Sequence, residues 1–112
     1  MAFDEDLKLV GFRLVQEKRD GSRTFSLARN PYLTYWLHVP WDEAADAIFT
    51  WEFAIGEYMD DYGLQIGTNE PLNQFLFPQT DQQVDQDLGA VVAAMEQVER
   101  MFAGMDFASR EA

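Results

Sequence analysis

Apolar and polar residues alternate along much of the first forty positions of this chain, which is the period of a half-buried β-strand. The alternation occurs in three runs, at residues 8–17, 23–29 and 32–39. In the first run it places Val10, Phe12 and Leu14 on one face. The first half of the chain is therefore predicted to form a three-stranded antiparallel β-meander.

The first two runs are separated by Asp20-Gly21, a dipeptide that strongly favours a two-residue hairpin turn. Pairing about this turn places Leu14 opposite Leu27. The apolar faces of both strands then coincide, which supports the register.

The apolar spacing changes to the helical period after the third run. Asp42 is a suitable N-cap and Gly63 a suitable end, which predicts a helix over residues 42–62. Its apolar stripe consists of Ala44, Ile48, Trp51, Ile55, Tyr58 and Tyr62. Phe49 and Phe53 fall outside this stripe, near the polar face, and so predict an exposed aromatic surface on the helix.

A second amphipathic helix is predicted to begin at a capping box, in which Thr80 is the N-cap and Gln83 reaches back to it. It would end near Gly104, and its stripe contains Val84, Leu88, Val91, Val92, Met95, Val98 and Phe102. Residues 72–77 form a short apolar piece that suits either an edge strand or one helical turn. The predicted class is α+β in the order β-β-β-α-α, as one domain over residues 1–112 with frayed ends at 1–6 and 105–112.

The net charge of −12 narrows the choice of partner. Between Pro31 and Glu99 the sequence has thirteen Asp and Glu residues and no Lys or Arg. Nucleic acids and anionic membranes are bound through Lys and Arg contacts to phosphate, so neither is expected as a direct partner. A basic protein suits such a charge distribution.

Candidate chemistry for catalysis or cofactor binding is sparse. The chain has no cysteine, which excludes disulfides and thiolate metal sites. Its one histidine, His38, has no recognisable catalytic partners, and no glycine-rich phosphate loop is present. We therefore expect no metal, no cofactor and no enzymatic activity.

The leading hypothesis is a non-enzymatic protein-binding module that engages a basic or aromatic-seeking partner through the first predicted helix. Its binding residues would be Phe49, Phe53, Glu57, Asp60 and Asp61. An alternative is a small-ligand domain with an aromatic pocket between sheet and helix, lined by Trp36, Trp41, Trp51 and Glu52. A third hypothesis is an enzyme that uses Glu52, which the predicted helix places in an apolar sector where the pKa of a carboxyl group rises.

In bulk properties alone the chain is similar to cytosolic chaperones of secreted bacterial effectors, to immunity proteins of toxins and to acidic inhibitors. This resemblance covers no residues and assigns no site. The acidic amino terminus lacks the positive region of a signal peptide, so we expect a cytoplasmic protein. The wide apolar arc of the first predicted helix also favours a homodimer.

Repulsion within the acidic run predicts that salt stabilises the fold. Raising the ionic strength from low to physiological at neutral pH should increase the melting temperature, because screening weakens like-charge repulsion. Thermal unfolding followed by circular dichroism measures this. An unchanged or lower melting temperature would mean that the acids are already paired.

Overall fold

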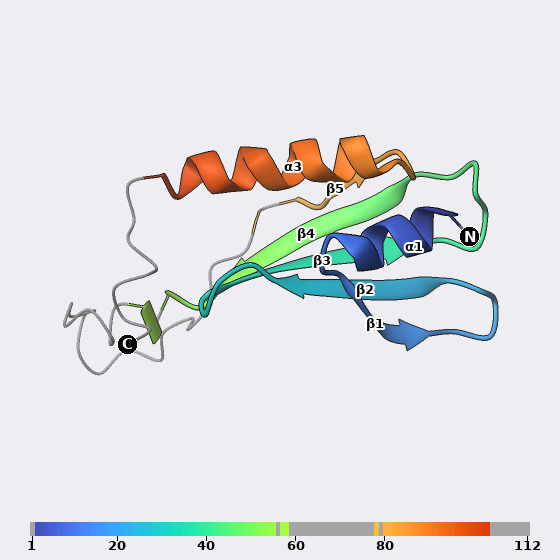
Figure 1. The fold of residues 1–112 in the computed structure, drawn as a ribbon, viewed down its shortest axis with the longest axis horizontal. Coiled ribbons are helices and arrows are strands. Elements are labelled where there is room, and N and C mark those ends of the chain that lie inside the picture. The colour runs from blue at the N-terminus through green and yellow to red at the C-terminus, as the bar shows by residue number, and fades with distance from the viewer. Residues whose placement is uncertain (1, 56, 59–77, 79, 104–112) are drawn as a thin grey trace.

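The computed structural model describes residues 2–55, 57–58, 78 and 80–103. Within them the chain forms an antiparallel five-stranded sheet and two helices (Figure 1). The elements in chain order are α1 (Ala2–Leu9), β1 (Arg13–Glu17), β2 (Arg23–Ala28), β3 (Leu33–Val39), β4 (Ala47–Phe53), β5 (Gln82–Val84) and α3 (Leu88–Met101). The α+β class is confirmed, and the predicted three-stranded antiparallel meander is present as β1–β3. The rest of the predicted order β-β-β-α-α differs, because a helix precedes the meander and two further strands follow it.

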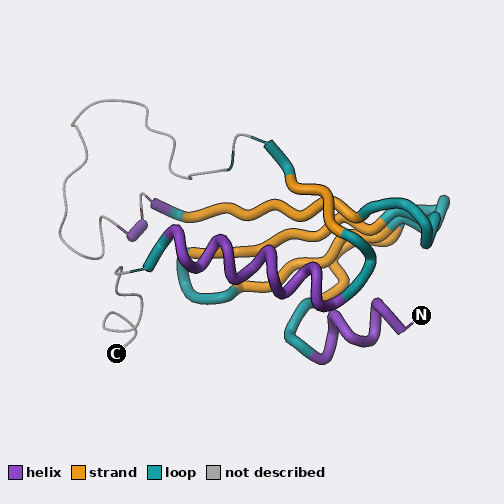
Figure 2. The backbone as a smooth tube through the Cα atoms, turned by 90° about the horizontal axis from the view of Figure 1, so that it is seen from above, coloured by secondary structure: helices purple, strands orange, loops and turns teal. Residues whose placement is uncertain are grey.

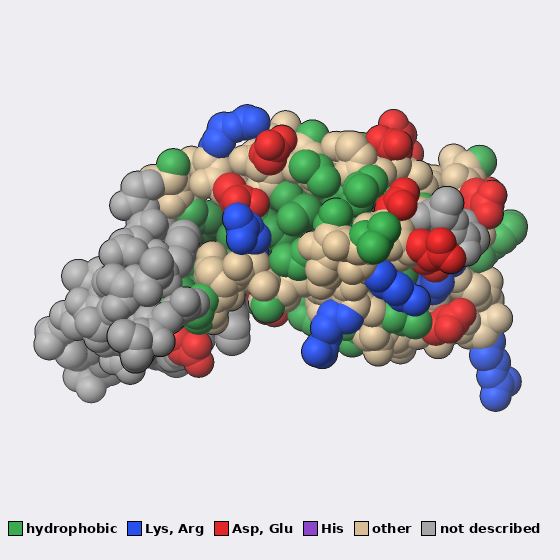
Figure 3. Space-filling view, viewed as in Figure 1, with side chains coloured by type: hydrophobic (Ala, Val, Ile, Leu, Met, Phe, Trp, Pro, Cys, Tyr) green, Lys and Arg blue, Asp and Glu red, His purple; other side chains and the backbone are tan. Residues whose placement is uncertain are grey.

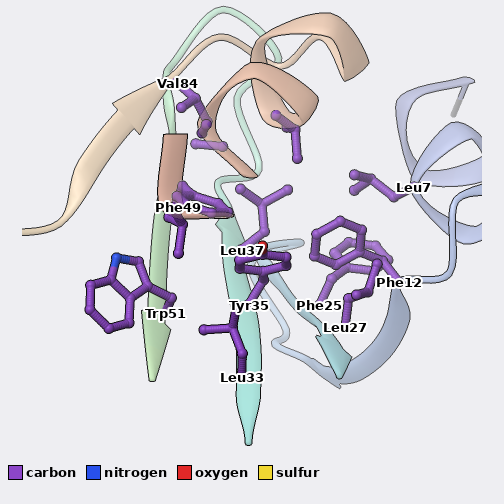
Figure 4. Close-up of a cluster of buried hydrophobic side chains, with 14 of the residues drawn as sticks. Leu7, Phe12, Phe25, Leu27, Leu33, Tyr35, Leu37, Phe49, Trp51 and Val84 are labelled. Atoms are coloured by element: carbon purple, nitrogen blue, oxygen red, sulfur yellow. The ribbon is translucent and has the colours of Figure 1, made fainter. Parts of the chain in front are cut away.

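The strands lie side by side in sequence order, and both helices lie on the same face of the sheet (Figures 1 and 2). Large side chains from this face and from both helices form one buried cluster (Figure 4). Strands β3 and β4 alternate strictly, with every second residue buried. The fold is therefore a two-layer arrangement in which the described helices leave the other sheet face, here called the outer face, uncovered.

Residues 47–53 form strand β4, so the helix predicted over residues 42–62 is wrong at its centre. Phe49 pairs with Leu37 of β3, and Trp51 pairs with Tyr35. This segment alternates with a period of two and is rich in aromatic and β-branched residues, which favour strands. The failure of Phe49 and Phe53 to fit the helical stripe was the sign of a strand.

The carboxyl-terminal helix begins later than predicted. Residues 82–84 pair with β4, so Val84 belongs to a strand and packs in the core. The N-cap of α3 is Asp87, whose side chain accepts a hydrogen bond from the backbone N–H of Ala90. Thr80 is therefore not the cap. The predicted stripe holds from Leu88 onward, where its members are buried or partly buried.

The first alternating run, residues 8–17, is a strand only in its second part. Residues 2–9 form α1, and β1 begins only at Arg13. An ion pair ties α1 to the sheet: Nε of Arg23 lies 2.8 Å from Oδ2 of Asp4, and Nη2 donates to Oδ1 at 2.9 Å. The contact of Nε with Oδ2 is too poorly aligned to be a hydrogen bond. The hydrogen bond within this ion pair is therefore the one that Nη2 donates to Oδ1. Residues 2–6, which were predicted to fray, form the first part of α1. Residues 72–77 and 105–112 lie outside the described residues, so the predictions for them stay predictions.

The hairpin predicted at Asp20-Gly21 is present, but its register differs. Glu17 pairs with Arg23, and Leu14 pairs with Phe25 rather than with Leu27. A backbone hydrogen bond from Lys18 to Ser22 closes a longer loop, and a register shift follows between residues 14 and 16. The bulge and the longer loop together move the pairing, a change that the turn dipeptide alone does not reveal.

The position of Phe53 in β4 gives the fold its most direct test. Phe53 is fully buried and packs against the ring of Phe102 at 4.7 Å between centroids. Phe53→Ala should lower the free energy of unfolding by about 3–5 kcal/mol, because it leaves a cavity in the core. Trp41→Ala is the matched control: this side chain is 65% exposed, and its loss should cost about 0.5 kcal/mol or less. Equal urea denaturation midpoints for the two variants would contradict the assignment of β4.

Candidate functional site

A groove lined by both apolar and charged residues opens on the helical face between α3 and the end of β2. It is lined by Val10, Gly11, Leu27, Ala28, Arg29, Met95, Glu96 and Glu99, and its volume is about 520 Å³. A second hollow of about 250 Å³ is lined by Arg29, Asn30, Leu33, Glu99 and Phe102. The two hollows are neighbours because both are lined by Arg29 and Glu99; we refer to them together as the groove and to this charged pair with its partners as the polar crossing. Figure 3 shows hydrophobic side chains gathered in the hollow between α3 and α1, with acidic side chains at its borders.

The groove exists because β2 is longer than the strand beside it. The β1–β2 pairing ends where Arg13 meets Ser26, so Leu27 and Ala28 extend beyond β1. Before Arg13 the chain turns away through Gly11, whose φ of 112° is open to glycine but strained for other residues. The Leu27 side chain lies directly against Gly11, where an added Cβ would be 3.4 Å from it. The α1–β1 connection thus forms one wall and α3 the other.

The polar crossing joins three elements. The hydroxyl of Tyr35, on β3, donates a 3.0 Å hydrogen bond to Oε2 of Glu99 on α3. Nη2 of Arg29, in the β2–β3 turn, lies 3.3 Å from Oε1 of the same carboxylate. The Arg29 and Glu99 side chains are 52% and 37% exposed, whereas Tyr35 is buried. Burial, and then the hydrogen bond to Glu99, raise the pKa of Tyr35 well above its ordinary value.

An exposed apolar strip continues from the groove onto β1. Among the described residues, six large hydrophobic side chains are strongly exposed, and four of them fall within residues 9–15. These four are Leu9, Val10, Leu14 and Val15. Val10 also lines the groove, so strip and groove are continuous. Apolar surface of this kind beside a groove is typical of a binding region.

Of the residues predicted for protein binding, Phe49 and Phe53 are core, with 1% and 0% of their surface exposed. Both point toward the helices from β4, so the prediction that they form an exposed surface is wrong. Glu57 is exposed but lies outside the groove lining. Asp60 and Asp61 lie outside the described residues.

The tryptophans predicted to line one pocket lie in three different places. Trp51 is buried and packs edge-on against Phe102 at 5.4 Å. Trp36 is on the outer face, where its Nε1 donates a 3.1 Å hydrogen bond to Oε1 of Glu52. Trp41 is exposed beyond the end of β3. Of these four residues, the structure brings together only Trp36 and Glu52. Glu52 lies on the outer face of strand β4 and not in the apolar sector of a helix, so the prediction for its surroundings is also wrong.

Sequence reasoning missed the groove because its parts come from distant segments. Arg29 is seventy residues from Glu99, and Tyr35 is sixty-four residues from it. One local signal was available: Glu99 follows Met95 by one helical turn, at the edge of the apolar stripe of α3. A carboxylate in that position can reach a partner on the sheet.

Comparison with protein-family models, with curated proteins and with solved structures finds no match to this chain. Neither described helix has the length and apolarity required to cross a bilayer. The described residues contain no group of three or more His, Asp or Glu side chains placed to hold a metal ion.

The tyrosine at the base of the crossing can be tested by Tyr35→Phe, which keeps the ring and removes the hydroxyl. We expect the free energy of unfolding to fall by about 1 kcal/mol, below the usual value for a charged hydrogen bond because Glu99 is partly exposed. This contribution also depends on pH. The folded-state pKa lies above the ordinary 10.0, so the stabilisation is full below that pH and declines as the pH rises above it.

Urea denaturation of both proteins at about pH 8 and about pH 11 measures this effect. The difference in stability between wild type and Tyr35→Phe should shrink at the higher pH. A constant difference would show that the phenol of Tyr35 is not held in its neutral form by the fold. Because both proteins share every lysine, ionisation of the lysine side chains cancels in the comparison.

Proposed function

We propose that this chain is a non-catalytic binding module whose groove holds an extended segment of a basic protein partner. The observation that carries the proposal is the combination of an apolar floor and an acidic wall. Leu27 and Met95 supply apolar surface, while Glu96 and Glu99 line the groove from α3. A segment with alternating apolar and basic side chains matches both features.

The groove has a preformed shape, which favours binding. Its walls belong to α3 and to the connection that follows α1, and each helix contributes residues to the main core. A partner therefore orders little of this chain when it binds, so less of the interaction energy is lost to entropy. The volume is within the range of sites that hold several side chains.

Electrostatics favour a basic segment over an acidic one. The groove lining contains two carboxylates and one guanidinium, and that guanidinium is already engaged with Glu99. The net charge of −12 adds a long-range field that attracts cations. This field should raise the association rate more than the affinity, and its effect should weaken as salt is added.

An extended conformation suits the open edge of β2. The last β1 pair is at Ser26 and Gly11 packs on Leu27, so a partner segment can meet the edge of β2 at Ala28, beyond that contact. Backbone pairing to a sheet edge supplies affinity, while the side chains that alternate into the groove supply specificity. The exposed strip at Leu9 and Val10 lengthens this surface.

The other hypotheses receive less support from the geometry. A ligand pocket built from Trp36, Trp41 and Trp51 lacks a common cavity, because the three side chains lie in different places. An enzyme using Glu52 stays a hypothesis, with a Trp36 hydrogen bond as its new setting. The homodimer prediction loses its reason, since the helix on which it rested is strand β4. The cytoplasmic location stays a prediction.

A methyl spectrum of the protein labelled with ¹³C at the methionine methyl groups tests the proposal directly. The probe is a blocked nine-residue peptide that alternates valine with lysine. Met95 lines the groove, whereas Met101, on the same helix, is exposed outside it. The peptide should shift the Met95 signal and leave that of Met101 in place. Peptides that alternate serine with lysine, or valine with glutamate, should shift Met95 much less.

Charge-reversal variants give the matched control for this titration. Glu96→Lys changes the groove wall and should weaken binding of the valine–lysine peptide about fivefold or more, which is about 1 kcal/mol. Glu43→Lys makes the same change of charge on the exposed β3–β4 connection, and its effect should be small. Equal effects, or no shift of Met95 at any peptide concentration, would contradict the proposal. A Met95 signal that moves with protein concentration alone would identify a second copy of the chain as the occupant.

A further inference from the structure

Glu99 and Arg29 are the two residues that line both hollows of the groove. A segment that lies along the groove must pass its carboxylate, whichever direction it runs. The carboxylate is also the only acidic group that lines both hollows. Its two oxygens have different partners, and the difference bears on what Glu99 does.

Oxygen Oε2 is held from the interior of the protein. The buried hydroxyl of Tyr35 donates to it at 3.0 Å, and the same hydroxyl lies 3.4 Å from the backbone carbonyl of Met95. The Tyr35 ring is fixed in turn against Phe49, at 5.6 Å between centroids. A carboxylate oriented by a rigid buried donor presents its second oxygen in a defined direction, and a partner then loses little entropy in meeting it.

Oxygen Oε1 is held more weakly and from the solvent side. Its contact with Arg29 is 3.3 Å long, and more than half of the Arg29 side chain is exposed. Exposed ion pairs of this kind contribute little to stability and exchange readily. A lysine or arginine from a bound segment can therefore replace Arg29 at Oε1 without loss of a buried interaction.

We propose that Glu99 anchors a lysine or arginine side chain of the bound segment and that Arg29 is its internal competitor. Tyr35 positions the carboxylate, and Arg29 neutralises it while the groove is empty. The proposal rests on the proposed function of the groove. It adds the specificity-determining residue and an autoinhibitory contact, the Arg29–Glu99 pair, that the cation of a bound segment must displace.

Arg29→Met tests the competition, because it keeps an apolar stem and removes the guanidinium. Affinity for the valine–lysine peptide, followed by the Met95 methyl signal, should rise about two- to fivefold, in line with the small energy of an exposed ion pair. Arg13→Met is the matched control. Arg13 is exposed on β1 and pairs with Ser26 on the outer face, so its loss changes the net charge equally but leaves the groove intact.

Glu99→Gln completes the test by a double-variant comparison. The glutamine keeps an acceptor for Tyr35 but removes the negative charge. In the Glu99→Gln protein, Arg29→Met should no longer raise the affinity for the valine–lysine peptide, because both substitutions act on the same contact. Thermal melts of all variants establish that each is folded at the temperature of the titration.

The outcomes separate the two proposals. A wild-type protein that binds the peptide at Met95, with no gain from Arg29→Met, would overturn the anchor and leave the groove standing. An equal gain from Arg13→Met would reveal a general charge effect, and a gain that persists with Glu99→Gln would show that Arg29 acts elsewhere; both would overturn the anchor. Failure of wild type and Arg29→Met alike to bind would overturn both proposals.

Discussion

The one-sided alternation of β3 and β4 is the constraint on which the rest of this structure depends. Both strands direct their large apolar side chains to the same face, where Tyr35, Leu37, Phe49 and Phe53 are almost fully buried. That face must be covered, so both described helices lie on it. The outer face instead carries hydrogen-bonded polar groups, such as the contact of Thr24 Oγ1 with His38 Nδ1 at 3.0 Å.

The groove depends on where the two helices lie on this face of the sheet. The pair Asp4–Arg23 holds α1 near the start of β2, and the contact between Tyr35 and Glu99 holds α3 over β3. The end of β2 lies between these two polar contacts, and there the buried Leu27 and the partly buried Met95 line a hollow at the border of the core. The hollow can persist without collapse because these contacts, one of them made by Glu99 of its own lining, hold the two helices in place.

The elements that have a local pattern were predicted correctly from the sequence, whereas those that depend on strand pairing were not. The alternation in β2 and β3 and the stripe of α3 from Leu88 onward are present, because each buries one face by its own periodicity. Strand β4 was misread because Ala44, Ile48, Trp51 and Ile55 also fit a helical spacing, and only the pairing with β3 decides between the two. Periodicity over so short an aromatic segment suits both states.

The candidate site was less predictable than the fold. The acidic charge that favours a basic partner is visible in composition, but the predicted anchors Phe49 and Phe53 are core residues. The groove depends on where β1 ends, on the turn at Gly11 and on the contact between Arg29 and Glu99. Each of these is a tertiary feature, and the local signal for them is weak: it consists of the position of Glu99 at the edge of the apolar stripe of α3.

Site-specific photo-crosslinking in the source cell tests the central claim, that the groove is the binding surface, most directly. A photo-reactive amino acid replaces Glu96 at the groove in one protein and Gln16, which is exposed on β1 and pairs with Thr24 of the outer face, in another. We expect a crosslink from position 96 alone, to a segment whose apolar residues alternate with lysine or arginine. Crosslinking from position 16 with equal yield, or from position 96 to an acidic segment, would contradict it.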